Sequence, residues 1–217
     1  QRFFHELRNA LAAIKAIKTS FDLSGLRRQG GWYMFTHPIR TLKTLPLIKR
    51  AIMDKDADFV EELKIFQRDN APLYKKYGLG ITRSTGNLAQ MEEEYMLQQS
   101  LAGKVVDYIP GVRASQRAYT TYLNRIRADY FDLLVETMGK GGRPLSPDQY
   151  KAIAQFVNDA TGIAGMGSHD MAASTLAQVF FSPRFVLSRF KIISGYRLWK
   201  SNDGARKAIA KEYGRMG

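Results

Sequence analysis

The 217-residue sequence contains no cysteine. This absence excludes disulfide-stapled scaffolds, thiol nucleophiles and zinc sites built on cysteine. Long apolar runs are missing too, because the most apolar stretch, residues 171–199, is broken by Pro183 and by several arginines and lysines. A membrane-spanning helix needs about 20 mainly apolar residues, so this stretch does not predict one. The first residues also lack the pattern of a signal peptide.

Positive charge is abundant and unevenly distributed. The chain carries 33 Lys and Arg against 20 Asp and Glu, which gives a net charge of +13. Residues 1–50 have a net charge of +8, residues 51–100 of −3, residues 101–150 of +2 and residues 151–217 of +6. Such basic ends attract nucleic acid, anionic lipid or an acidic partner protein. The alternative is that the charge serves solubility alone.

Apolar periodicity predicts an all-α fold. With 45% hydrophobic and 24% charged residues, the chain has the composition of a folded protein. No alternating strand pattern appears, and we expect an irregular multi-helix bundle of about seven to nine helices. In the first half we expect an amphipathic helix over 2–19 and a structured loop with a short helical turn over 20–37. A helix over 38–53, interrupted or kinked near Pro46, follows, and then a helix that begins after Asp58, runs through Asn70 and is ended by Pro72.

Gly78, Gly80 and Gly86 mark the clearest loop, so we predict a basic helical segment over 1–75, a hinge over 76–90 and a helical domain over 91–217. In that domain we expect helices over 92–102, 119–138, 147–160, 171–181, 184–199 and 203–213. Of these helices, the one over 147–160 has the clearest N-terminal signal, because Ser146 and Gln149 form a capping-box pattern around Pro147. Because the chain begins with Gln1 instead of Met, we interpret it as an ordered piece of a longer protein.

The motifs that resemble catalytic or metal sites lack a required residue or the required spacing. Asp54, Asp56 and Asp58 imitate a calcium loop, but the glycine and the glutamate that the loop requires are missing. The run 168–170 (Ser-His-Asp) holds the residue types of a hydrolase triad, yet adjacent residues cannot converge as a triad does. His5 and His37 are isolated, and the glycines at 139–142 follow a helix where a phosphate loop would follow a strand. We therefore predict a non-enzyme without a cofactor or metal.

Arginines interleaved with aromatic residues form the remaining pattern. Such mixtures suit stacking on bases with phosphate contact, and they suit protein interfaces equally well. We leave these two uses open. The candidate contact residues are Arg27, Arg28, Trp32, Arg113, Arg117, Arg125, Arg184, Arg189 and Arg197.

Several stretches, in order, resemble the large polyvalent protein-associated domains, which are helical modules of very large bacteriophage and plasmid proteins. These stretches are SFDLSGLRRQGGWYMFTHP (20–38), GVRASQRAYTTYLNRIRADYFD (111–132), VNDATG (157–162) and FFSPRFVLSR (180–189). One departure follows the stretch VNDATG (157–162). The family commonly continues it with Arg and Gly, whereas this chain has Ile163 and Ala164.

The resemblance implies a non-catalytic segment of a phage internal virion or ejection protein, carried in the particle and delivered into the host cell. The implied partners are portal, tail or sister subunits, with genomic DNA and the host envelope as further contacts, and the segment is expected to be oligomeric in the particle. The alternative is a DNA-binding helical module of an intracellular polyvalent phage or plasmid enzyme, which would be found in the host cytoplasm.

Overall fold

The computed structural model describes residues 24–82, 112–140, 144–163, 183–201 and 203–215. Within these ranges the regular structure is entirely helical, which confirms the predicted all-α multi-helix fold. In chain order the described helices are α2 (Ser24–Thr36), α3 (Pro38–Leu42), α4 (Leu45–Met53), α5 (Ala57–Phe66), α6 (Ala71–Tyr77), α8 (Val112–Gly139), α9 (Pro147–Ala160), α11 (Pro183–Ile193), α12 (Tyr196–Lys200) and α13 (Asp203–Gly214).

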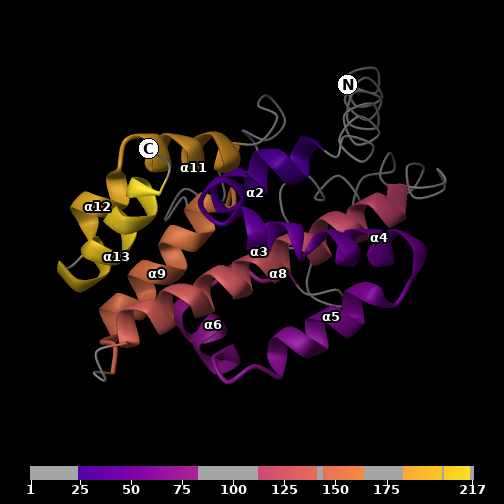
Figure 1. Ribbon diagram of the computed structural model, residues 1–217, viewed down its shortest axis with the longest axis horizontal. Helices are drawn as coiled ribbons and strands as arrows, with labels where there is room; N and C mark the ends of the chain where they lie inside the picture. Colours follow the sequence, from indigo (N-terminus) through magenta and orange to yellow (C-terminus); the bar gives the residue numbers. More distant parts are fainter. Residues whose placement is uncertain (1–23, 83–111, 141–143, 164–182, 202, 216–217) are drawn as a thin grey trace, which may run out of the picture.

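Helix α8 is the longest described helix and runs through the middle of the molecule (Figure 1). Helices α2, α4, α5, α9 and α13 all pack against it. Leu123, Ile126, Tyr130 and Leu134 are buried along α8, as their three- and four-residue spacing predicts. The C-terminal helices α11, α12 and α13 gather around α9 at one side of this frame.

Local signals define the ends of α9. Ser146 is the N-cap, and its Oγ accepts a hydrogen bond from the backbone N–H of Gln149 at 3.3 Å. The Gln149 side chain in turn accepts from the N–H of Ser146 at 2.8 Å, so the predicted capping box is confirmed. At the other end Gly162 has a φ of +89°, which is the left-handed conformation expected of a C-terminal glycine.

The prediction of a loop over residues 20–37 is wrong where the structure describes them, because Ser24–Thr36 form helix α2. The glycines that suggested a loop have another use. At Gly30 a Cβ atom would lie only 2.9 Å from Cε1 of Tyr122 and still closer to its hydroxyl. Gly30 therefore permits the close approach of α2 to α8, which is a tertiary reason that local composition does not reveal.

Two further boundaries differ from prediction. Pro72 does not end a helix that begins after Asp58; it lies in the first turn of α6, after α5 has ended at Phe66. The predicted helix over 184–199 is also not continuous, because Gly195, with a φ of +65°, separates α11 from α12. The kink near Pro46 is confirmed by the division between α3 and α4.

The predicted hinge is described only up to Thr82. Two asparagines hold the backbone of residues 78–82 against the rest of the protein. Asn158 accepts from the N–H of Gly80 and donates to the carbonyl of Gly78, each at 2.8 Å. Asn124 forms the same double contact with the backbone of Thr82, at 2.9 and 2.6 Å. The domain division itself stays a prediction.

Several other expected features lie outside the described residues. These are the helices over 2–19, 92–102 and 171–181, the glycines at 141 and 142, His5, and the Ser-His-Asp run at 168–170. In the part of the chain that the structure describes, no helix is long and apolar enough to cross a membrane.

Candidate functional site

The predicted contact residue Trp32 lies in the protein core. Its side chain is 7% exposed, and its ring packs edge-on against Tyr213 at 4.8 Å and against Phe156 at 6.3 Å between centroids. These contacts join α2 to α9 and α13. In this conformation Trp32 stabilises the fold and does not present its ring to a partner.

Arg117 binds the end of a neighbouring helix. Its Nε donates to the carbonyl of Ala51 at 2.7 Å, and one of its terminal nitrogens donates to the carbonyl of Ile52 at 3.2 Å. The last carbonyls of a helix have no partner within the helix and carry its negative dipole end. The guanidinium therefore caps α4 and fixes its C-terminus against α8.

Arg125 belongs to an ion-pair network between α5 and α8. Its guanidinium contacts Glu61 at 2.6 Å and Asp129 at 3.0 Å. The Glu61 side chain is only 3% exposed, so its charge depends on this partner. The two acidic residues also raise the pKa of Arg125 above its usual value, against the opposing effect of burial.

Arg197 has an equally internal role on α12. Its Nε donates to a carboxylate oxygen of Asp159, and a terminal nitrogen donates to Gln155 at 2.7 Å. Burial raises the pKa of Asp159, and Arg197 opposes that rise. Arg189 is half-buried on α11, and this burial lowers the pKa of its guanidinium.

The structure does not gather the predicted contact residues into one surface. Trp32, Arg117, Arg125 and Arg197 contact different elements of the fold. Arg27 and Arg28 lie on α2, Arg113 on α8 and Arg184 on α11, but their side chains are outside what the structure describes. Contact of these residues with a partner remains a prediction.

His37 is isolated in the sequence, but the tertiary structure surrounds it with polar groups. Its Nδ1 lies 2.9 Å from Oγ1 of Thr36 and 3.6 Å from Glu212, and its Nε2 lies 2.7 Å from a guanidinium nitrogen of Arg215. Because guanidinium can only donate, Nε2 accepts and the proton of the neutral ring resides on Nδ1. Burial, with Arg215 and Arg40, lowers the pKa of His37 to about 4.

Solvent reaches this cluster only from the side of Arg215. The side chains of His37 and Glu212 are 9% and 2% exposed, and the hydroxyl of Tyr130 donates to Glu212 at 2.7 Å. The His37 ring also stacks on Tyr33, with 5.1 Å between the centroids. The groups resemble an acid–base set in type, but their hydrogen bonds are directed at one another. A structural network is the better interpretation.

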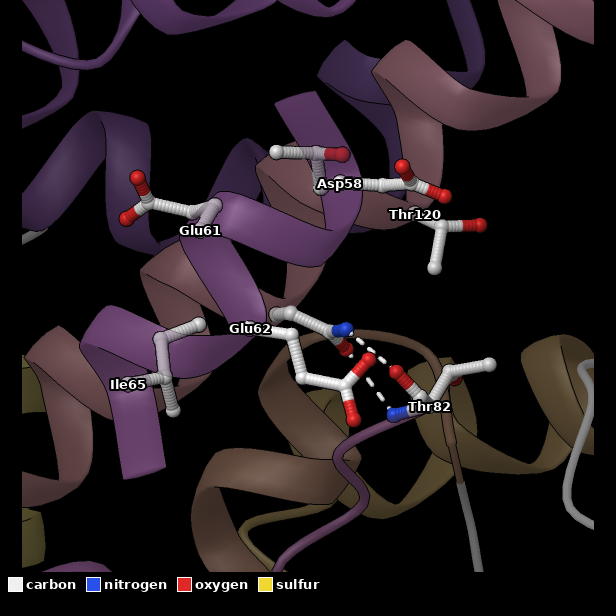
Figure 2. Close-up of a pocket in the computed structure, with 8 residues that line it drawn as sticks. Asp58, Glu61, Glu62, Ile65, Thr82 and Thr120 are labelled. Carbon is white, nitrogen blue, oxygen red and sulfur yellow. Dashed lines mark hydrogen bonds between the residues drawn. The ribbon is translucent and has the colours of Figure 1, made fainter. Parts of the chain in front are cut away.

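An acidic recess lies between α5 and α8 and has a volume of about 220 Å³, part of it open solvent. Figure 2 shows Asp58 beside Thr120 and Glu62 beside Thr82, whereas Glu61 points the other way. No group of carboxylates and histidines suited to a metal ion occurs among the described residues. The lining residues are Asp58, Glu61, Glu62, Ile65, Thr82, Thr120, Thr121 and Asn124.

Large apolar side chains on α11 and α12 are exposed to solvent. Val186, Phe190 and Ile193 share one side of α11 and are 60%, 70% and 83% exposed. Trp199 on α12 is 82% exposed. Large exposed apolar groups that gather on one face mark docking surfaces.

A second exposed face lies on α3 and α4, and we call it the α3–α4 face. Its apolar members are Ile39, Leu42, Leu45, Ile52 and Met53, and its basic members are Arg40, Lys43, Lys49 and Arg50. The pattern of arginine beside aromatic rings does not predict this face, because its basic residues lie among aliphatic side chains. The available signal was the absence of any acidic residue between Ser24 and Met53.

Comparison of the chain with protein families, curated proteins and solved structures gives no match.

Proposed function

We propose that the chain is a non-catalytic structural segment of a bacteriophage internal virion or ejection protein. It docks on portal, tail or sister subunits and assists genome delivery. The observation that carries the docking role is the exposed apolar side of α11 and α12. Phe190, Ile193 and Trp199 each expose 70% or more of their surface, and burial against a partner would stabilise an assembly.

The phage assignment derives from the sequence resemblance, and the structure is compatible with it through its all-α fold. The non-catalytic role is supported by the way the acidic groups are used. Glu61, Asp159 and Glu212 are each buried and each contacts an internal partner: Arg125, Arg197 and Tyr130 respectively. A general acid or base needs access to a substrate proton, and these carboxylates are directed at protein groups.

Cross-linking mass spectrometry of purified particles tests the proposal. We expect peptides of this chain in the particle, with cross-links from Lys200 on α12 to another virion protein. A variant with Phe190→Ser and Ile193→Ser should lose these cross-links and be packaged poorly. Leu63→Ser provides the matched control, because Leu63 is an exposed apolar residue on another helix. Particles that contain no peptide of this chain would contradict the proposal.

The alternative, a DNA-binding module of an intracellular enzyme, is favoured by the four exposed lysine and arginine residues of the α3–α4 face. Binding through phosphates releases counterions, so affinity for duplex DNA would fall steeply between low and physiological salt. A chain that binds DNA in this way and is missing from particles would favour the alternative. Absence of DNA binding even at low salt would exclude it.

A further inference from the structure

We infer that the α3–α4 face lies on an anionic lipid bilayer surface. This inference deepens the proposed function and rests on it, because a delivery protein meets the host envelope. The face combines exposed aliphatic side chains with lysine and arginine, and the sequence contains no acidic residue between Ser24 and Met53.

The geometry places the apolar residues on one side of the α3–α4 segment. The two helices follow each other directly, and the Thr44 N–H donates to the carbonyl of Thr41 at 2.9 Å across the junction. Thr41, Thr44 and Ala51 are buried on the inner side. At about 100° per residue, Ile39, Leu42 and Met53 fall on the side away from them, and Leu45 and Ile52 lie at the edge of that side.

The outer side is uncovered to an unusual degree for aliphatic residues. Ile39 is 71% exposed, Leu42 62%, Leu45 49%, Ile52 42% and Met53 75%. Water around these groups is unfavourable, and transfer into the acyl boundary of a bilayer would remove it. Phosphate groups of nucleic acid offer no such gain to an aliphatic side chain.

The charges favour an anionic surface. Arg40, Lys43, Lys49 and Arg50 are exposed among the apolar residues, and the first acid after them, Asp54, pairs with Arg50 at 3.6 Å. Long basic side chains can lay their apolar stems on lipid and place their charge at the phosphates. A second copy on this face would set like charges opposite each other. The centre of a protein interface is usually depleted in lysine.

Co-sedimentation of the 217-residue chain with vesicles tests the inference. Vesicles of phosphatidylcholine alone are compared with vesicles of phosphatidylcholine and phosphatidylglycerol. We expect binding to the anionic vesicles that weakens as salt is raised. The variant Lys43→Glu with Lys49→Glu should bind at least about tenfold more weakly, because each base near an anionic surface contributes about fivefold.

A second variant, Leu42→Ser with Ile52→Ser, should lose binding without a change of charge. Two matched controls carry the same changes at other exposed residues. They are Lys75→Glu with Lys76→Glu on α6, and Leu63→Ser on α5. Circular dichroism and thermal unfolding establish that each variant is folded. All the substituted residues are exposed, so we expect native unfolding temperatures.

Equal binding to neutral and anionic vesicles, no binding, or equal losses in the controls would overturn the inference. So would a dimer in light scattering that Leu42→Ser with Ile52→Ser dissociates, or binding of duplex DNA but not vesicles through Lys43 and Lys49. The two proposals fail separately. Peptides in the particle with no vesicle binding would overturn only the lipid contact, and vesicle binding with no peptides in the particle would overturn only the virion role.

Discussion

At the scale of single residues, the environment of His37 shows how burial changes a titratable group. The ring accepts a hydrogen bond from Arg215 and stacks on Tyr33, and its folded-state pKa is lowered to about 4 from the usual 6.5. The unfolded chain therefore binds more protons than the folded chain between these two pH values. The stability that His37 contributes is present above pH 6.5 and is lost as the pH falls toward 4.

We predict that the free energy of unfolding falls by about 1–2 kcal/mol between pH 7 and pH 5 because of His37. Urea titrations at both pH values measure this change. The variant His37→Asn, which keeps a donor near Thr36, should show a smaller fall. Glu212, whose raised pKa acts in the opposite direction, is present in both proteins, so the difference between them reports His37. An equal fall in the variant would show that other groups cause it.

The arginines give a related lesson at this scale. Arg117, Arg125 and Arg197 had the sequence context of partner contacts, yet all three bind groups within the protein. Apart from Asp129, which is four residues from Arg125, their partners are distant in the chain, so no local pattern distinguishes an arginine that caps another helix from one that faces solvent. The acidic partners Glu61 and Asp159 gave no separate signal.

At the scale of elements, the contact of α2 with α8 depends on the absence of a side chain at Gly30. We predict that Gly30→Ala destabilises the protein by about 1–2 kcal/mol, because the strain of overpacking exceeds the gain in helix propensity. Tyr122 is 3% exposed, so its ring has little room to move away. Equilibrium urea unfolding measures the effect.

Gly31 provides the matched control. It lies in the same helix, but a Cβ atom there would meet nothing nearer than Phe35 at 4.0 Å. Gly31→Ala should therefore stabilise the protein by about 0.5–1 kcal/mol. The cost of Gly30→Ala should also be smaller in a Tyr122→Phe background, where the hydroxyl is gone. Equal effects at Gly30 and Gly31 would contradict the close contact.

At the scale of the whole molecule, Asp132 on α8 connects the N-terminal helices to the central frame. Its carboxylate accepts hydrogen bonds from Arg68 at 3.0 Å, from Asn70 at 3.0 Å and from the hydroxyl of Tyr74 at 2.8 Å. These partners are 58 to 64 residues away in sequence. Tyr74 is 1% exposed, so its hydroxyl has no ready access to water.

We predict that Asp132→Ala lowers the free energy of unfolding by about 2–3 kcal/mol, because it leaves the buried Tyr74 hydroxyl and the Asn70 amide without their acceptor and leaves Arg68 with Asp129 alone. Asp132→Asn keeps one acceptor oxygen and should cost less. Chemical unfolding followed by both circular dichroism and tryptophan fluorescence measures the loss. A change below about 0.5 kcal/mol would show that the network contributes little.

The sequence by itself determined the helical class, the capped start of α9, the left-handed Gly162 and the division near Pro46. Each of these depends on residues within one or two turns of each other, so local propensity and capping are sufficient. Residues 24–36 are the exception, because a helix whose glycines serve a distant tyrosine resembles a loop when read locally. The uneven charge was equally evident from the sequence.

Only the tertiary structure decided which residues are available to a partner. It placed Trp32 in the core and engaged Arg117, Arg125 and Arg197 inside the fold, and it left the aliphatic residues of α3 and α4 exposed beside their lysines. The physical reason is that exposure depends on contacts between segments far apart in the chain. Periodicity defines the faces of a helix, but only packing decides which face is covered.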